Sequence, residues 1–359
     1  MASPQFHQLQ VAAVRPLTTD SVAISFALPN ELVAQFQFKP GQYLTLRATV
    51  NGQDVRRSYS ICSHHKHRLE VGIKRVDHGL FSTYAQGLSI GSTVQVMVPQ
   101  GNFTATVGRN NKYLLLAVGS GITPCLSIIK SVLADEPDSH ITLAYGNRTA
   151  STIMFRADIN DLKDKHTERF NVMHILSAER QEAACFNGRL NGEKIQLLQQ
   201  LGLLDVHSCD AIYLCGPQTM IEEARAVLAG LGVSGGCVRS ELFTSTGAPQ
   251  ASKPVQTQQT DKLPQGGSDV TIVLDGAERA VQVDSSKETV LTAARRAGFD
   301  LPFSCAGGMC ATCRCKVIEG ETSMDLNFSL ADWEIEAGYT LACQTRPGSD
   351  KVTLDFDAI

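Results

Sequence analysis

Four cysteines near the C-terminus have the spacing of ligands to a metal centre. Cys305, Cys310 and Cys313 follow the pattern C-x4-C-x2-C, and Cys343 comes 30 residues after the third of them. Two irons bridged by two sulfides need four thiolates, and this is the spacing of plant-type [2Fe–2S] sites. A zinc site is the alternative, but zinc favours paired C-x2-C units and the segment has only one. The spacing therefore predicts one [2Fe–2S] cluster held by these four cysteines.

The remaining cysteines of the 11 in the chain have no such spacing. Because the N-terminus lacks the charged start and apolar stretch of a secretory signal, we expect a cytoplasmic protein, in which thiols stay reduced. Cys315 is expected to pack in the core, on the strand that leaves the cluster loop. Ordinary buried or partly exposed thiols are expected at Cys62, Cys125, Cys185, Cys209 and Cys237.

A second candidate site is the segment Arg57-Ser58-Tyr59-Ser60. A flavin needs a cation for its phosphates, an aromatic surface for its ring system and a short polar group near N5, and the segment supplies all three. By itself the pattern is weak, because a surface arginine and a core tyrosine would look the same. Gly79-Leu80-Phe81-Ser82 strengthens it, since this turn precedes an expected helix whose N–H groups can bind phosphate. The candidate flavin residues, which suit FAD and FMN alike, are Arg57, Ser58, Tyr59, Ser60, Lys74, Gly79, Phe81 and Ser82.

Two glycine-containing turns indicate a nicotinamide site. The run Gly119-Ser120-Gly121-Ile122-Thr123-Pro124 joins an apolar strand to an expected helix, and its glycines permit close approach of a dinucleotide. Thr123 is expected to cap the helix and Pro124 to lie in its first turn. Cys215-Gly216-Pro217 ends a later strand, where Cys215 could approach the nicotinamide; a buried thiol is the alternative. The candidate residues are Gly119, Gly121, Thr123, Cys215, Gly216 and Pro217.

The segment Gly146-Asn147-Arg148-Thr149 bears on the choice between NADPH and NADH. Sites that prefer NAD often place an acidic residue here for the ribose 2′-hydroxyl, whereas an arginine can bind a 2′-phosphate. The segment has no acid, and Arg148 is present, with Ser177 and Arg180 as a second candidate pair. These residues favour NADPH, with a solvated loop as the alternative reading of Arg148.

The elements that must position these residues divide the 359-residue chain into a multidomain protein. Short alternating strands predict an antiparallel β-barrel for residues 1–108, and strands alternating with helices predict a parallel-sheet α/β domain for 109–245. Residues 246–268 are rich in Pro, Gln and Thr and are expected to be a linker. Residues 269–359 are expected to begin with strands 270–274 and 279–283 and a helix 289–297 capped by Ser285 or Ser286.

Charge and hydropathy exclude other classes of protein. The net charge is −4, with the acidic residues concentrated in 269–359. No basic patch with interleaved aromatic residues suggests nucleic acid, and no apolar run is long enough for a membrane helix. The acidic run 319–336 around Trp333 is either a solvated face or a docking surface. His64, His65 and His67 lie beside Lys66 and Arg68, so a solvated loop is expected there rather than a metal site.

Taken in order, the motifs RSYS, GLFS, GSGITP, CGP and CAGGMCATC resemble those of ferredoxin–NADP⁺ reductase-type flavoproteins with a C-terminal plant-type ferredoxin domain. The resemblance covers nearly the whole chain. It implies an α+β (β-grasp) C-terminal domain, FAD, NADPH and a [2Fe–2S] cluster. It also implies Ser60 near flavin N5, with Thr123 and Cys215 positioning the nicotinamide as the other catalytic residues.

The resemblance further implies that electrons pass to the di-iron oxygenase subunits of a multicomponent complex. A Rieske-type or other ring-hydroxylating oxygenase is an alternative acceptor. A non-enzymatic iron–sulfur carrier or sensor is an alternative of another class, which the complete set of flavin and nicotinamide residues disfavours.

Overall fold

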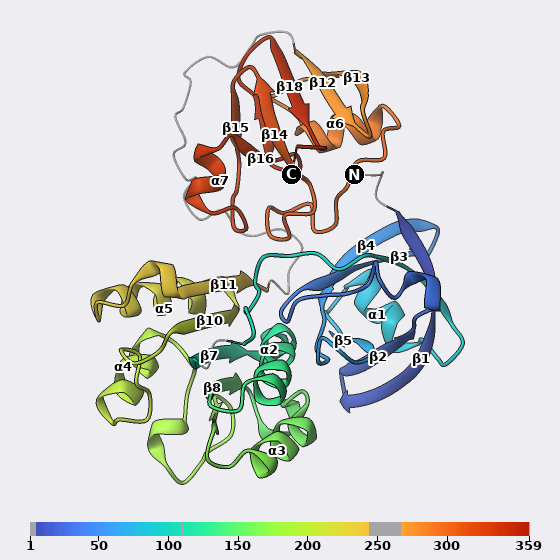
Figure 1. The fold of residues 1–359 in the computed structure, drawn as a ribbon. Coiled ribbons are helices and arrows are strands. Elements are labelled where there is room, and N and C mark those ends of the chain that lie inside the picture. The colour runs from blue at the N-terminus through green and yellow to red at the C-terminus, as the bar shows by residue number, and fades with distance from the viewer. Residues whose placement is uncertain (1–4, 109–110, 244–266, 359) are drawn as a thin grey trace. The chain divides into compact units, whose positions relative to one another are not determined.

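The computed structural model describes residues 5–108, 111–243 and 267–358. These residues form two compact units, one containing most of the barrel together with the α/β domain and the other containing the C-terminal domain (Figure 1). The predicted linker 246–268 lies outside the described residues up to residue 266, and Ser268 is already the first residue of a strand. In the described part of the chain, no helix is long and apolar enough to cross a membrane.

The N-terminal domain is a six-stranded antiparallel barrel sheet in the order β4-β3-β6-β1-β2-β5. Alternating apolar residues such as Leu9 and Val11 line its core, which is why these short segments form strands. A short helix, α1, and a 3₁₀ turn, Asn30–Leu32, complete the domain. The bounds are β1 Phe6–Thr18, β2 Ser21–Ala27, β3 Tyr43–Val50, β4 Gln53–Ser60, β5 Leu69–Lys74, α1 Leu80–Gln86 and β6 Thr93–Met97.

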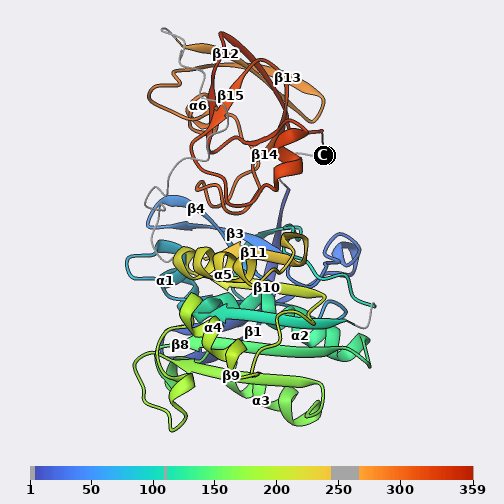
Figure 2. The same ribbon diagram turned by 90° about the vertical axis from the view of Figure 1, so that its left-hand side faces the viewer.

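The second domain is a parallel five-stranded sheet in the order β11-β10-β7-β8-β9. In Figure 2, β11 and β10 lie toward one edge of this sheet, and β8 and β9 lie toward the other. The bounds are β7 Lys112–Val118, α2 Ile122–Asp135, β8 His140–Asn147, α3 Arg156–Lys165, β9 Phe170–Leu176, α4 Gly192–Gln200, β10 Ala211–Gly216, α5 Gln218–Gly230 and β11 Val238–Leu242.

Helices cover both faces of this sheet, which explains why β7 is apolar at nearly every position (Figure 1). Its Tyr113 and Leu115 belong to the core shared with α2 and α3, whereas Leu114 and Leu116 belong to the core shared with α4 and α5. The carboxyl ends of β7 and β10 lie next to each other where the strand order reverses. Ligands of such sheets bind at this position.

The C-terminal domain has the predicted β-grasp arrangement, a mixed sheet in the order β13-β12-β18-β14-β16 with one helix, α6, packed on the core. The predicted strands and helix are confirmed, but the predicted caps are wrong. Thr289 caps α6, its Oγ1 accepting a hydrogen bond from Thr292 N at 3.5 Å. The bounds are β12 Ser268–Leu274, β13 Ala277–Val283, α6 Val290–Arg296, β14 Arg314–Glu319, β15 Thr322–Met324, α7 Asp332–Glu336, β16 Tyr339–Leu341, β17 Thr345–Pro347 and β18 Lys351–Asp355.

Candidate functional sites

The cysteine loop presents backbone donors to sulfur. Cys305 Sγ accepts hydrogen bonds from Gly307 N at 3.3 Å and Met309 N at 3.4 Å. The loop passes through Gly308 at φ +75°, where a Cβ would lie 2.9 Å from the carbonyl oxygen of Leu326. Glycine is therefore required at this position both for backbone conformation and for space.

The four predicted ligands come together in two hydrogen-bonded pairs. Cys305 pairs with Cys310, and Cys313 pairs with Cys343, which the chain brings back from β16. The hydrogen bond from Cys310 lowers the pKa of the Cys305 thiol to about 7. The hydrogen bond from Cys313 likewise lowers the pKa of Cys343.

Polar side chains also reach these sulfurs: Thr312 Oγ1 donates to Cys310 Sγ at 3.1 Å, and Gln344 Nε2 lies 3.6 Å from Cys343 Sγ. Anionic thiolates with N–H and O–H donors are what an iron–sulfur cluster requires, so this donor set fits the predicted cluster. Cys315 lies on β14, is buried in the core and is not part of the group, as predicted.

The predicted flavin segment is the end of β4. Arg57 is exposed and Tyr59 is half-buried on the same face of the strand, whereas Ser60 is buried on the other face. The Tyr59 ring lies 5.6 Å, centroid to centroid, from that of Phe81 on α1. An exposed cation beside an aromatic surface fits the phosphate and ring system of a flavin.

Two other predicted flavin residues have partners within the barrel. Ser82 Oγ accepts a hydrogen bond from Val76 N at 3.1 Å and donates to Gly79 O at 3.3 Å, so this hydroxyl closes the turn before α1. Lys74 Nζ lies 3.6 Å from a carboxylate oxygen of Asp20. Both residues shape the barrel at the predicted site.

Ser60 faces the α/β domain, where its Oγ donates to Glu241 Oε2 at 3.3 Å. Glu241 lies on β11, directly opposite Cys215 on β10. The Cys215 thiol is fully buried, which raises its pKa well above the usual value and keeps it neutral. Glu241 was not among the predicted site residues. In the sequence, only its position in the last strand of the α/β domain could have indicated a role at the site.

The glycine turn at residues 119–124 lies against Cys215 at the end of β10. Gly121 packs so closely on the backbone of Cys215 that a Cβ would overlap its carbonyl oxygen, so only glycine fits. The structure corrects the prediction for Thr123. Helix α2 starts at Ile122 with Gly121 at the N-cap, and Thr123 Oγ1 donates instead to Ser120 O at 3.0 Å. Ser60, Thr123 and Cys215 are thus brought to one junction between barrel and α/β domain.

The predicted 2′-phosphate residues lie at the carboxyl ends of β8 and β9. Arg148, Ser177 and Arg180 are exposed, and the backbone N–H of Ala178 donates to Arg148 O at 2.8 Å, which holds the two segments together. Glu179 is an acidic residue outside the predicted set. It accepts a hydrogen bond from the backbone N–H of Ala150 at 2.7 Å.

Asn147 supplies an independent sign of a ligand at this edge. It is 8% exposed, and its Nδ2 is buried with only a loose contact to the Tyr145 hydroxyl in place of a well-formed hydrogen bond among the described residues. A buried donor without a good acceptor is costly, and a polar ligand at the carboxyl edge would satisfy it. This poorly satisfied donor fits a nucleotide in the crevice.

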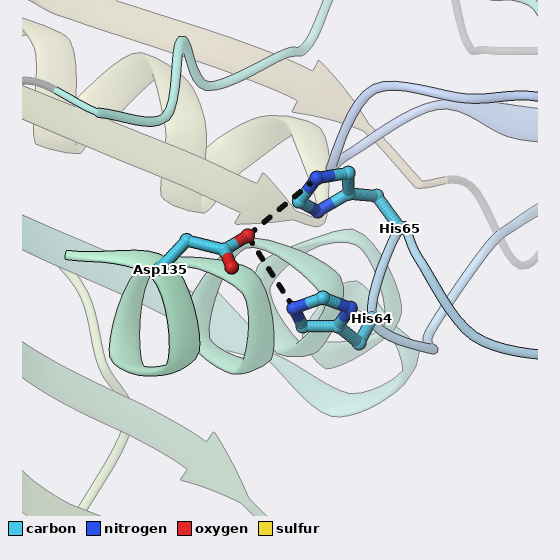
Figure 3. A group of neighbouring side chains, drawn as sticks. All are labelled: His64, His65 and Asp135. Carbon is cyan, nitrogen blue, oxygen red and sulfur yellow. Dashed lines mark ion pairs between the residues drawn. The ribbon is translucent and has the colours of Figure 1, made fainter.

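Figure 3 shows His64 and His65 directed at Asp135. Each Nε2 lies 3.5 Å from Asp135 Oδ2, and Lys66 Nζ lies 2.8 Å from Oδ1. Lys66 N donates to His64 Nδ1 at 3.0 Å, so neutral His64 carries its proton on the nitrogen that faces the carboxylate. The group forms a polar contact between this loop and α2. The expected solvated loop is wrong for His64, whose side chain is only 10% exposed.

This contact has a predicted pH dependence. Burial lowers the pKa of His64 and of His65 below the usual value near 6.5. As pH falls through about 6.5, the unfolded chain binds protons first, so stability is lost until the folded-state pKa values are passed. Thermal unfolding at pH 7.5 and 5.5 should show this loss. Replacing both residues by glutamine should make the loss smaller, and an unchanged loss would contradict the assignment.

Three protein families match the chain in sequence. The oxidoreductase FAD-binding domain matches residues 8–105, the oxidoreductase NAD-binding domain 115–226 and the 2Fe-2S iron–sulfur cluster binding domain 272–348. One of the subunits of 1,2-phenylacetyl-CoA epoxidase from Escherichia coli K12 is 41% identical over 98% of both chains. The chain belongs to the ferredoxin reductase-type flavoproteins with a C-terminal 2Fe-2S domain.

Other relatives of this reductase are components of oxygenase systems. The ferredoxin reductase component of 3-ketosteroid-9-alpha-monooxygenase from Rhodococcus rhodochrous is 31% identical over 97% of this chain and 96% of its own. The structure of phthalate dioxygenase reductase superposes with a TM-score of 0.59 at 21% identity, covering 99% of this chain and all of the other, and shares the three-domain fold. The reductase is therefore a flavin- and iron–sulfur-dependent oxidoreductase of an oxygenase system.

Proposed function

We propose that this reductase takes electrons from NADPH and passes them through FAD and the [2Fe–2S] cluster to a di-iron oxygenase component. The observation that carries the proposal is the junction of Ser60, Glu241, Cys215 and the glycine turn, together with the separate four-cysteine loop. The 41% identity to the epoxidase component supports a multicomponent phenylacetyl-CoA epoxidase in phenylacetate degradation as the partner. We place this complex in the cytoplasm.

The residues at the junction have separable roles. When bound, the flavin accepts a hydride as an electron pair and releases electrons singly, as a one-electron cluster requires. Arg57 and Tyr59 would hold its phosphate and ring, and Ser60, whose proton points to Glu241, would offer its oxygen to the flavin. Thr123 and Gly121 position the nicotinamide, and the neutral thiol of Cys215 adds no charge where a hydride must pass.

The cysteine loop holds the acceptor of these electrons. Its thiolates would bind the irons, and the N–H groups of Gly307 and Met309 stabilise negative charge on Cys305. The protein thereby supplies orientation and electrostatics, while the cofactors supply the redox chemistry. The phenylacetyl-CoA thioester itself would bind to a different component of the complex.

For the choice of nucleotide, we predict that Arg148→Ala raises KM for NADPH about tenfold, equivalent to about 1.4 kcal/mol, and leaves KM for NADH nearly unchanged. The reason is that the exposed Arg148, on a segment hydrogen-bonded to the one that carries Ser177, can bind the 2′-phosphate that only NADPH carries. Steady-state kinetics with both nucleotides measure the difference. Arg225→Ala, at an exposed position on α5, is the matched control. Equal changes for NADPH and NADH would contradict NADPH preference.

The experiment that tests the proposed function is the visible spectrum of anaerobically purified protein before and after NADPH is added. Flavin and iron–sulfur absorbance, both bleached by NADPH, are expected. Iron–sulfur absorbance without flavin and without a response would instead support a carrier or sensor.

A second candidate acceptor is a Rieske-type or other ring-hydroxylating oxygenase, and the similarity to a component of 3-ketosteroid-9-alpha-monooxygenase supports an acceptor other than the epoxidase. Reduction assays with purified components decide between them. Faster reduction of the di-iron component than of a Rieske component is expected.

A further inference from the structure

The barrel meets the nicotinamide turn through a residue that has no side chain. Gly72 on β5 is buried and pairs across the sheet with Ala23, which belongs to the core of the α/β domain. A methyl group on Gly72 would lie 2.7 Å from Thr123 Cγ2 and 2.8 Å from Phe155 Cζ. Real carbon contacts are much longer, so a side chain here would push these groups away.

Phe155 is held firmly in this contact. It is 1% exposed and occupies the left-handed region, with φ 58° and ψ 27°, at the start of α3. A bulky residue in this conformation persists only when its surroundings enforce it. The guanidinium of Arg15 and the ammonium of Lys130 lie 5.7 and 5.9 Å from the ring centroid.

The same two cations fix α3. Arg15 forms two hydrogen bonds to Asp158, at 2.7 and 3.1 Å, and Lys130 Nζ lies 3.5 Å from its carboxylate. Arg15 comes from β1 of the barrel, Lys130 from α2 and Asp158 from α3. The ring of Phe155 therefore has little freedom to move if the space beside Gly72 is filled.

The geometry points to Gly72 and Phe155 as positioning residues for hydride transfer, because Thr123 and Phe155 both pack against Gly72 and this packing sets the spacing between barrel and nicotinamide turn. The inference rests on the proposed function of Thr123. The Oγ1 of Thr123 donates a hydrogen bond to Ser120 O, and its methyl group packs against Gly72. A displacement of the turn would be transmitted to the reacting atoms, where an error of about 1 Å can cost about 100-fold in rate.

The test is stopped-flow reduction of the holoenzyme flavin at saturating NADPH. Gly72→Ala should lower the limiting rate constant by about 10- to 100-fold. Flavin content, cluster absorbance and reduction by dithionite should not change. The matched control is Gly87→Ala in the same barrel, where φ is −93° and the nearest atom, Tyr84 O, lies at an ordinary 3.5 Å. It should keep the wild-type rate.

A compensating substitution separates positioning from general damage. Phe155→Leu removes the ring atoms that the new methyl group would meet, so the double variant should lose less than the product of the two single losses. If Gly72→Ala does not fold, Phe155→Leu alone carries the test. It should slow flavin reduction by about threefold or more at unchanged flavin content.

Full-rate reduction in Gly72→Ala with intact flavin would overturn the inference. So would multiplicative losses in the double variant, or full-rate reduction in Phe155→Leu when Gly72→Ala does not fold. A wild-type protein whose bound flavin is not reduced by NADPH would instead overturn the proposed function, and the two failures are therefore distinguishable.

Discussion

Cys310→Ser is expected to remove the [2Fe–2S] absorbance and to lower reduction of the oxygenase component by at least about 100-fold. Serine offers a neutral hydroxyl, a poor ligand for iron, in place of a soft thiolate. Cys310 Sγ also receives hydrogen bonds from Cys305 N at 3.5 Å and Thr312 Oγ1 at 3.1 Å, which are arranged for sulfur. Visible spectroscopy and component-reduction assays measure the two effects.

The flavin half of the reaction should survive this substitution, because the cysteine loop belongs to a different compact unit from the nicotinamide site. Flavin reduction by NADPH should stay within about twofold of wild type. Cys315→Ser is the matched control, since this thiol is also buried in the same domain but lies on β14 outside the ligand group. It should keep the cluster. Wild-type cluster absorbance in Cys310→Ser would refute the ligand assignment.

Glu241→Gln should slow flavin reduction by NADPH about 100-fold while leaving reduction by dithionite unchanged. The carboxylate accepts the Ser60 proton at 3.3 Å, and a neutral amide is a weaker acceptor that can also present its N–H groups. The orientation of the Ser60 hydroxyl is then lost. Rapid mixing of the oxidised holoenzyme with NADPH measures the rate constant.

Ser60→Ala should act on the same step, so the double variant should be little slower than either single variant. The matched control is Glu222→Gln, an exposed position on α5 of the same domain, which should react like wild type. An increase in KM for NADPH with no change in the limiting rate constant would contradict the proposed role of Glu241.

The fold class and the gathering of the four cysteines were predictable because their signals are local. Period-two alternation marks the barrel strands, and continuous apolar segments such as Tyr113–Val118 mark a sheet covered on both faces. Three cluster ligands lie within nine residues, so their spacing carries most of the geometry.

Local hydrogen-bond choices were less predictable. The cap of α6 is Thr289 rather than Ser285 or Ser286, and Thr123 bonds to Ser120 O instead of capping α2. From the sequence, several nearby hydroxyl side chains are equally able to accept a hydrogen bond from the first N–H groups of a helix. Only the path of the chain decides which one faces the free N–H groups.

Residue types and short spacings alone therefore predict three domains, a four-thiolate iron–sulfur site and the segments for a flavin and a dinucleotide. Tertiary structure alone pairs Ser60 with Glu241, His64 with Asp135, and Gly72 with Thr123 and Phe155. The members of each pair lie far apart in the chain and on different elements. Their contact arises from the packing of the barrel against the α/β domain, and no periodicity or spacing along the chain records that packing.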